Sequence, residues 1–267
     1  MEKEDLLQMI HEAMAGDEQP LPAIVNTDNR IKFGVEPVLP YSIEEAVNRL
    51  RINISFLGSD VKKILVISSE PNEGKSFIAM NLWKQMAIAG ERSVLIDLDM
   101  RNSTMATKYN LSREDGAELK GTSHYLSGND SIEDMILHTV LPEGDILPNA
   151  DNIVNPSMLF ESRKFTEMMR YTGSHYRYVF IDAPPLGLVS DGELIGSKCD
   201  GAILCVRAGM TSRRIVRNSI QQLERAGCPI LGIVLNRVGG SGKSYGKYYG
   251  KKYYGKKYYG DKYYGGK

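Results

Sequence analysis

The chain of 267 residues has a formal net charge of zero, with 42% hydrophobic and 25% charged residues. This composition is that of a globular protein, and no apolar stretch approaches the roughly 18 residues of a membrane span. The N-terminus is too polar for a signal peptide. Cys199, Cys205 and Cys228 have no C-x-x-C spacing and no histidine cluster nearby, which favours buried, reduced thiols. One α/β domain with appendages is therefore expected.

The first 41 residues form a segment of their own in the predicted organisation. Residues 4–14 carry apolar side chains at helical spacing, which predicts a short amphipathic helix. Four prolines between residues 16 and 41 favour an extended strap, and a disordered leader is the alternative.

A helix is predicted to open the main domain. Ser42, followed at the third position by Glu45, fits a capping box, and apolar side chains at helical spacing continue beyond it. Glu45, Asn48 and Arg51 recur every three residues, so they project together from a different face of this helix.

The segment Ser69–Ser76 has the context of a phosphate-binding loop. It follows the apolar run Ile64–Ile67 and opens the helical pattern Phe77–Ala89, so it joins a strand to a helix. Glycine lets backbone amides approach phosphate oxygens, the lysine reaches the β- and γ-phosphates, and the serine hydroxyl can ligate Mg²⁺. Ser69 stands where such loops usually have their first glycine, and a plain strand–turn–helix corner is the structural alternative. The predicted nucleotide-binding residues of this segment are Pro71, Asn72, Glu73, Gly74, Lys75, Ser76 and Phe77.

Two further strand patterns end in carboxylates. The apolar run that begins at Ser93 ends in Asp97 and Asp99, and the run that begins at Tyr178 ends in Asp182. Buried parallel strands are nearly all apolar, and ligands bind at the carboxyl edge of open α/β sheets. These acids are therefore candidates for a ligand site, with Asp182 suited to hold Mg²⁺ through its water shell. A helix cap or a surface loop is the structural alternative for Asp97 and Asp99.

The remaining patterns complete an α/β domain. Residues 102–130 are polar and poorly patterned, which favours a mobile excursion with short helices. Later elements are predicted as a helix at Ile132–His138, a strand at Asp145–Pro148, a helix from Asn155 towards Tyr171, a strand at Gly201–Arg207, a helix at Arg213–Ala226 and a strand at Pro229–Arg237. Apolar strands separated by helices predict a doubly wound, mostly parallel sheet with helices on both faces, spanning residues 42–240. Asn236, at the end of the last strand, is a candidate for binding an adenine edge or for structural capping.

Residues 241–267 form a low-complexity tail. They contain eight lysines and one acid, a local charge of +7 on a chain whose net charge is zero. Regular glycines and dense lysines leave no face to bury, so the tail is predicted to be disordered. Composition leaves two interpretations open, an array of hydroxyls offered for modification or a basic-aromatic arm for nucleic acid. The tail holds nine of the chain's 15 tyrosines, at Tyr245, Tyr248, Tyr249, Tyr253, Tyr254, Tyr258, Tyr259, Tyr263 and Tyr264.

Together these features resemble the bacterial tyrosine kinases, the P-loop kinases that control capsular and exopolysaccharide synthesis. The matching motifs are Ser69–Ser76 (Walker A), Val94–Arg101 (Walker A′), Val179–Pro185 (Walker B) and the terminal tyrosine cluster. The three nucleotide motifs are shared with the wider group of deviant P-loop ATPases, and the resemblance covers the chain from about residue 40 onward. The chromosome-partitioning and division-site-selection ATPases of that group have a second lysine where this chain has Glu70, which argues against that class.

The resemblance implies transfer of the γ-phosphoryl group of ATP, bound with Mg²⁺, to tyrosines of the tail. The implied catalytic residues are Lys75, Asp97 (as the base) and Arg101, and the implied metal ligands are Ser76, Asp99 and Asp182. The residues themselves do not separate the roles of Asp97 and Asp99, and they do not separate Mg²⁺ from Mn²⁺. Arg101 is expected to orient this acidic pair or to touch phosphate.

The resemblance also implies partners and a location. The family's subunit-contact motif, Glu-x-x-Arg-x-x-Arg, is present at Glu45 and Arg51, but Asn48 replaces the first arginine and weakens the expectation of a ring-like homo-oligomer. A kinase domain without a membrane segment resembles the family's two-polypeptide form. That form implies a cytoplasmic protein held at the inner membrane face by an activator of the polysaccharide chain-length-determinant type. A tyrosine phosphatase is a further implied partner, and nucleic acid is not.

One alternative function uses the same fold. A regulatory ATPase or a nucleotide-gated scaffold has the same three motifs, and its basic tail then binds membrane or nucleic acid.

Overall fold

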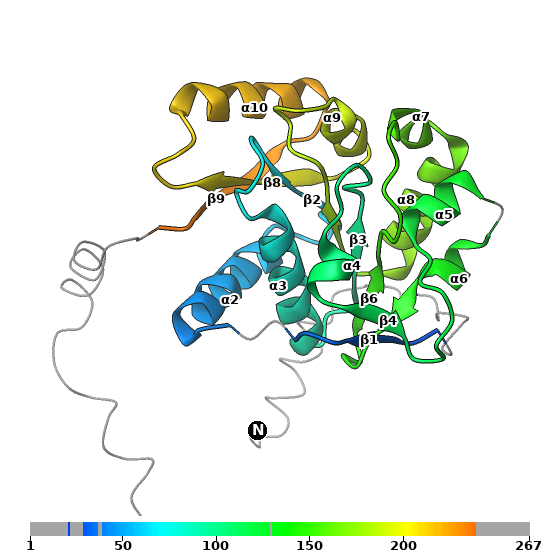
Figure 1. Cartoon of the computed structure of the whole chain (residues 1–267). Coiled ribbons are helices and arrows are strands. Elements are labelled where there is room, and N and C mark those ends of the chain that lie inside the picture. Colours follow the sequence, from blue (N-terminus) through cyan, green and yellow to red (C-terminus); the bar gives the residue numbers. More distant parts are fainter. Residues whose placement is uncertain (1–20, 22–28, 37–38, 129, 239–267) are drawn as a thin grey trace, which may run out of the picture.

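The computed structural model describes residues 21, 29–36, 39–128 and 130–238 of the chain. The predicted helix at residues 4–14 and the tail at residues 241–267, with all of its tyrosines, lie outside this part (Figure 1). No helix of the described ranges combines the length and the apolar composition that crossing a bilayer requires.

Within the described ranges, a sheet of seven strands forms the centre of the domain, in the order β5-β6-β3-β7-β2-β8-β9 (Figure 1). Its strands are β2 Lys63–Ser68, β3 Ser93–Asp97, β5 Leu137–His138, β6 Gly144–Leu147, β7 Tyr178–Asp182, β8 Gly201–Arg207 and β9 Ile230–Asn236. Neighbouring strands pair in parallel, except that β5 runs antiparallel to β6. The prediction of a mostly parallel sheet is confirmed.

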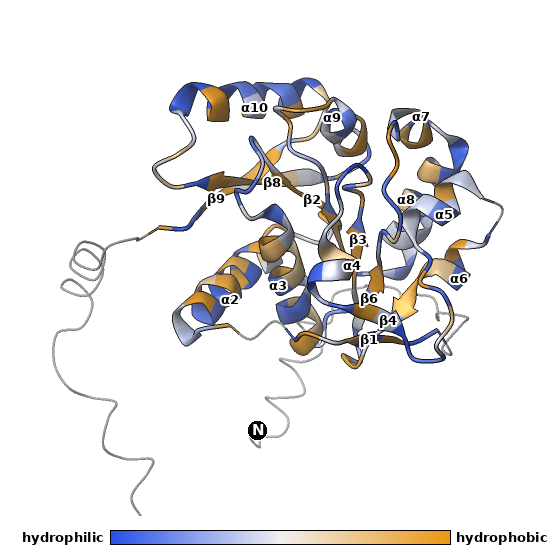
Figure 2. Ribbon diagram, viewed as in Figure 1, coloured by the Kyte–Doolittle hydropathy of each residue, from blue (hydrophilic) through white to orange (hydrophobic). Residues whose placement is uncertain are grey.

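Helices cover both faces of this sheet, as the sequence predicts. Figure 1 shows α2 and α3 on one side of the sheet and α9 and α10 on the other, and Figure 2 shows apolar strands between helices with hydrophilic outer faces. The helices are α2 Tyr41–Ser55, α3 Lys75–Ile88, α4 Met105–Lys108, α5 Thr122–Ser127, α6 Ile132–Met135, α7 Ser157–Phe160, α8 Arg163–His175, α9 Asp191–Gly196 and α10 Arg213–Arg225.

Alternate residues of the central strand β2 point to opposite faces and belong to two separate cores. Leu65 and Ile67 pack in the core that includes residues of α8 and α10, whereas Ile64 and Val66 pack with residues of α2 and α3. All four side chains are fully buried, because a parallel strand covered on both faces has no solvent side. This burial is the physical reason for the unbroken apolar runs in the sequence.

A segment ahead of α2 also belongs to the core. Strand β1 (Ile31–Phe33) pairs antiparallel with β4 (Leu111–Arg113) in a second, two-stranded sheet. Ile31 is buried, and the ring of Phe33 stacks on Trp83 with 6.4 Å between centroids. The expected strap is extended over these residues, and it packs directly on the domain.

Some short elements differ from the predictions. The excursion at residues 102–130 contains the expected short helices α4 and α5, but also β4, which the sequence did not signal. The helix predicted at Ile132–His138 is wrong beyond Met135, because Leu137 and His138 form the edge strand β5 instead. Strand β4 pairs with β1 and β5 pairs with β6, so each element depends on a partner from elsewhere in the chain.

The start of α2 also corrects a prediction. Ser42 does not cap the helix, which begins at Tyr41 with Pro40 as its N-cap and without a side-chain cap. The Pro40 carbonyl accepts hydrogen bonds from the amides of Ile43 and Glu44, at 2.9 and 3.0 Å. Proline presets φ near −65° and suits the entry to a helix, and the helix begins two residues before the position predicted with Ser42 as its cap.

The cysteines are buried and form no disulfide with one another, as expected. Cys199, Cys205 and Cys228 all lie in the described part of the chain as free thiols. Burial raises the pKa of each thiol, which keeps it in the protonated, unreactive form.

Candidate active site

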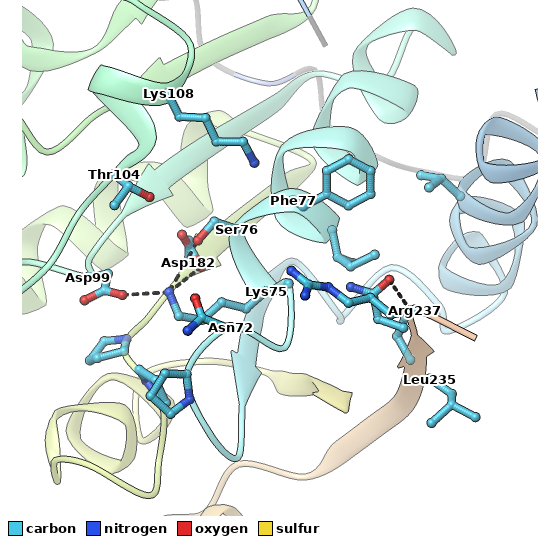
Figure 3. Close-up of a pocket in the computed structure, with 18 of the residues that line it drawn as sticks. Asn72, Lys75, Ser76, Phe77, Asp99, Thr104, Lys108, Asp182, Leu235 and Arg237 are labelled. Carbon is cyan, nitrogen blue, oxygen red and sulfur yellow. Dashed lines mark hydrogen bonds and ion pairs between the residues drawn. The ribbon is translucent and has the colours of Figure 1, made fainter. Parts of the chain in front are cut away.

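A cavity of about 1060 Å³ lies at the carboxyl edge of the sheet, where the sequence predicts the site (Figure 3). Its walls are the Ser69–Ser76 loop, the segments that follow β3 and β7, the end of β9 and one side of α2. Glu73 and Asp97 do not line it. The predicted site residues that do line it are Pro71, Asn72, Gly74, Lys75, Ser76, Phe77, Asp99, Arg101, Asp182 and Asn236.

The Ser69–Ser76 loop turns through backbone conformations that few residues adopt. Gly74, the N-cap of α3, has a φ of +95°, and Asn72 has a φ of +63°. These turns place the N-terminus of α3, which begins at Lys75, at the cavity wall, where its unpaired amides and positive dipole favour an anion. Ser69, in place of the usual first glycine, has no positive φ, so its side chain causes no strain.

Lys75 and two carboxylates form a compact charged cluster in the cavity (Figure 3). The Lys75 Nζ lies 2.6 Å from Asp99 Oδ2 and 3.5 Å from Asp182 Oδ1, and it donates to Ser76 Oγ at 3.3 Å. Burial lowers the pKa of Lys75, but attraction to Asp182 and Asp99 outweighs burial, so the net pKa is raised and the ammonium stays charged. Side chains from the starts and ends of separate elements thus meet at one point.

Asp97 lies behind this cluster. It is 1% exposed and sits opposite Asp182 in the pairing of β3 with β7. Its carboxylate accepts hydrogen bonds from the Ser103 hydroxyl and, at 3.1 Å, from the Asp99 amide. Burial, together with repulsion from Asp182, raises the pKa of Asp97 to about 7. The structure therefore distinguishes the positions of two acids that the sequence could not distinguish, because Asp99 lines the cavity and Asp97 does not.

Arg101 does not contact the acidic pair, which corrects one of its expected roles. Its guanidinium donates to both carboxylate oxygens of Asp191, at 2.6 and 3.2 Å, and also to the Val154 carbonyl and the Ser157 hydroxyl. Asp191 is fully buried, so this ion pair holds the segment after β3 against α7 and α9. Arg101 also lines the cavity, and a contact with phosphate stays a prediction.

Glu73 braces the loop from outside the cavity. Its side chain accepts hydrogen bonds from the amides of Glu70 (2.8 Å) and Arg207 (3.0 Å) and from the Thr211 hydroxyl. Glu73 is 2% exposed, so these three donors replace the water molecules that would otherwise hydrate its carboxylate. The sequence placed Glu73 among the nucleotide-binding residues. The structure turns its side chain toward the end of β8, so any nucleotide contact would come from its backbone.

Replacement of Glu73 by glutamine is expected to loosen this brace. A carboxamide has only one accepting oxygen, so at least one buried donor loses its partner, at a cost of about 1–3 kcal/mol. The free energy of unfolding, measured by urea titration, should fall by that amount. Glu70→Gln is the matched control, since its carboxylate makes no hydrogen bond or ion pair with other described residues. Equal stability of the two variants would contradict the brace.

Asn236 is bound to the loop in this structure. Its Nδ2 donates to the Glu73 carbonyl at 2.9 Å, and its Oδ1 accepts from the Arg237 amide at 2.8 Å. These two hydrogen bonds agree with the alternative role predicted for Asn236, structural capping. The adenine contact stays a prediction, because Asn236 also lines the cavity.

On α2, the predicted face of Glu45, Asn48 and Arg51 is present. The Arg51 Nε donates to Asn48 Oδ1 at 3.0 Å. The last arginine of the motif therefore binds the asparagine that stands in place of the motif's first arginine. Arg49, one position along, lines the cavity instead. The contact of Glu45 and Arg51 with another subunit stays a prediction.

The site has oxygen donors for a divalent cation. Asp182 Oδ1 is buried and accepts no hydrogen bond from the described residues, and Lys75 is its ion-pair partner at 3.5 Å. In the described ranges, no three histidine, cysteine, aspartate or glutamate side chains are grouped closely enough to hold a metal ion. Mg²⁺ is commonly bound by one or two carboxylates together with waters and substrate phosphates. The donors present, Ser76, Asp99 and Asp182, therefore fit a magnesium ion that shares its ligands with a phosphate.

Three residues important to the site were missed by sequence reasoning. Asp191 and Thr211 act through partners far along the chain, Arg101 and Glu73, and no local pattern marks them. Lys108 lines the cavity from α4, in a segment whose polar composition gave no periodic signal.

A loop of this shape, with a lysine and a hydroxyl at the start of a helix beside a parallel sheet, defines the P-loop nucleotide-binding class. A family model described as an AAA domain matches residues 61–223. The tyrosine-protein kinase CpsD of Streptococcus agalactiae is 37% identical over 211 residues, which are 78% of this chain and 90% of CpsD.

Solved structures agree with this comparison. The kinase domain of VpsO is 28% identical, with a TM-score of 0.67 over 74% of this chain and 97% of that one. The septum site-determining protein MinD from Pyrococcus horikoshii, solved with Mg-ADP, shares the fold, with 23% identity and a TM-score of 0.57 over 68% and 72% of the two chains. This chain belongs to the capsule-synthesis family of bacterial tyrosine kinases, within the AAA-domain proteins, and it is a protein-tyrosine kinase.

Proposed function

We propose that this kinase binds ATP together with Mg²⁺ and transfers the γ-phosphoryl group to the tyrosines of its own tail. The observation that carries the proposal is the convergence of Lys75, Ser76, Asp99 and Asp182 on one open cavity. Phosphoryl transfer needs mainly positioning and charge neutralisation, and a buried lysine beside metal-binding carboxylates supports both.

Covalent geometry lets the tail reach this cavity. Val238 lines the cavity, and Tyr245 is seven residues further along the chain. The 27 residues from 241 to 267 span at most about 90 Å, enough to reach either the chain's own site or that of a neighbour. We place the transfer between two subunits, because Glu45 and Arg51 retain part of the family's subunit-contact motif.

The proposed reaction forms a bond between the tyrosine oxygen and the γ-phosphorus and breaks the bond from that phosphorus to the bridging oxygen, so that ADP leaves. The phenol proton passes to a carboxylate, since a phenol with a pKa near 10 is little ionised at pH 7. Lys75 and the first amides of α3 hold the phosphates in place. When bound, Mg²⁺ supplies neutralising charge to the phosphates, held by Ser76, Asp99 and Asp182 directly or through water.

Asp97 is the base in this proposal, as the family resemblance implies. The Ser103 hydroxyl and the Asp99 amide occupy its carboxylate, so a tyrosine reaches it only after the Ser103 hydrogen bond opens. Asp99, which lines the cavity, needs no such rearrangement. Comparison of Asp97→Asn with Asp99→Asn at saturating Mg²⁺ would assign the roles, since loss of a metal ligand is relieved by more Mg²⁺ and loss of a base is not.

The proposed biological role is control of capsular or exopolysaccharide synthesis and export. The proposed partners are further copies of the chain in a ring-like homo-oligomer, a membrane-bound activator of the polysaccharide chain-length-determinant type, and a tyrosine phosphatase that reverses the modification. We place the kinase in the cytoplasm, at the inner face of the membrane through this activator. The relation to CpsD supports the kinase assignment on which this role rests, and the family resemblance implies the partners and the location.

The test is to map phosphotyrosine in a mixture of two variants. One chain carries Lys75→Met with an intact tail, and the other has an intact site with phenylalanine at all nine tail tyrosines. The mixture is incubated with labelled ATP, Mg²⁺ and the activator's cytoplasmic segment. We expect label in the tail of the Lys75→Met chain, which only a neighbouring subunit can supply.

Other outcomes would revise the proposal. Label that appears in the unaltered chain but never in the mixture would place the transfer within one chain. Phosphate released to water without tyrosine label would favour a regulatory ATPase. Label outside residues 245–264 would overturn the assignment of the tail as substrate.

A further inference from the structure

A second lysine faces the cavity from the side opposite the phosphate loop. Lys108 is the last residue of α4, and its ammonium lies 5.6 Å from the ring centre of Phe77 and 5.1 Å from that of Tyr109. Figure 3 shows its side chain reaching from α4 toward the space above Ser76 and Asp182. All these residues except Tyr109 line the same cavity.

The charge of Lys108 is held in place without being neutralised. Its ammonium forms no ion pair or hydrogen bond with any other residue in the described part of the chain, and aromatic faces position a cation while leaving its charge available. Lys75 is different, because its ammonium is already paired with Asp99 and Asp182. Lys108 is an exposed residue, and partial desolvation against the cavity wall lowers its pKa while attraction to Asp182 opposes this shift.

The acids of the site and an incoming triphosphate favour further positive charge, in addition to Lys75, a bound Mg²⁺ and the arginines that line the cavity (Arg49, Arg101 and Arg237). Asp97, Asp99 and Asp182 lie together at the ends of β3 and β7, while the phosphate loop itself contains a single cation, Lys75. A triphosphate adds further negative charge to this place, and transfer spreads charge over the γ-phosphoryl oxygens. Positive charge already fixed beside those oxygens stabilises the bound state without reorganisation.

We infer that Lys108 is a second phosphate-binding residue, whose ammonium contacts the γ-phosphoryl group of ATP from the α4 side of the cavity. This inference rests on the proposed function, since it takes ATP as the ligand. Lys75 and Lys108 then lie on opposite sides of the phosphate chain. The excursion between β3 and β6 acquires a role in the reaction through this residue.

The test compares two nucleotides on the full chain. Affinities for Mg-ADP and for a non-hydrolysable Mg-ATP analogue are measured by calorimetry for the unaltered chain and for Lys108→Met, Lys108→Arg and Lys120→Met. We expect Lys108→Met to weaken analogue binding at least 10-fold and ADP binding less than 3-fold, with Lys108→Arg close to the unaltered chain. Lys120 is the control because it lies in the same excursion, pairs with Asp130 at 3.6 Å and does not line the cavity.

The outcomes separate this inference from the function it rests on. Equal loss for both nucleotides would mean that Lys108 only packs against Phe77, and unchanged affinities would remove it from the site; either result overturns the inference and leaves ATP binding intact. If the unaltered chain bound neither nucleotide, the proposed function would fail first. Thermal unfolding of each variant checks that the fold survives.

Discussion

Substitution of Lys75 by methionine should lower tyrosine phosphorylation of the tail by at least about 100-fold. The Lys75 side chain is 12% exposed, and its ammonium lies 2.6 Å from Asp99 and 3.5 Å from Asp182. Methionine keeps the unbranched shape and most of the length of the side chain, but it lacks the terminal ammonium and its charge. The two carboxylates then face the incoming phosphates without compensation, so both nucleotide affinity and the transfer step should suffer.

The measurement is incorporation of labelled phosphate into the full chain with Mg²⁺ and the activating segment. Lys198→Met is the matched control, since it makes the same change at an exposed position outside the cavity. We expect Lys198→Met to behave as the unaltered chain. If Lys75→Met retained more than a tenth of the activity, the site described at the carboxyl edge of the sheet would be the wrong one.

Substitution of Gly74 by alanine should disable the phosphate loop. Gly74 has a φ of +95°, which costs an L-residue about 1–2 kcal/mol. An added Cβ would also lie 2.1 Å from Asn236 Nδ2, which donates to the Glu73 carbonyl in the same loop. Relief of that clash has to move either the loop or the end of β9. Because a displacement of about 1 Å can cost 100-fold in rate, we expect phosphorylation to fall by about that factor.

Gly90→Ala separates the two causes. Gly90 has a φ of +83°, but apart from its chain neighbours no atom of the described residues lies within 4 Å of an added Cβ, so a substitution there has the backbone cost alone. The double variant Gly74→Ala with Asn236→Ala removes the clash and should recover part of the lost nucleotide affinity. The steric argument would be refuted by a Gly74→Ala variant that matched Gly90→Ala in stability and still phosphorylated its tail at the normal rate.

The central strands could be predicted because burial leaves a local trace. A parallel strand covered on both faces must be apolar along its length, so Ile64–Ile67 and the residues before Asp97 and Asp182 stood out from their surroundings. Polar residues at the ends of such runs are then informative, since the ends of parallel strands gather at one edge. The short strands β1, β4 and β5 left no such trace, because each forms only against a partner from elsewhere in the chain.

The sequence around a charged residue did not predict which group that residue binds in the folded chain. Arg101 was expected near Asp97 and Asp99, its neighbours in sequence, yet its guanidinium binds Asp191, 90 residues away. Asp97 and Asp99 are two residues apart in the sequence. Asp97 is the last residue of β3 and does not line the cavity, whereas Asp99 lies in the turn that follows and lines it. Glu73 was predicted to contact the nucleotide because it lies inside the loop. In the structure its carboxylate accepts hydrogen bonds from the Arg207 amide and the Thr211 hydroxyl.

The class of fold, the phosphate loop and the set of acids at the strand ends could all be predicted from local patterns, because each depends on the order of residues within one strand, turn or helix. The folded chain was needed to show which acid faces the cavity, what Arg101 and Glu73 bind, and that Lys108 lines the cavity beside the predicted phosphate site. Those outcomes depend on which distant segments pack together, and packing is a property of the whole folded chain.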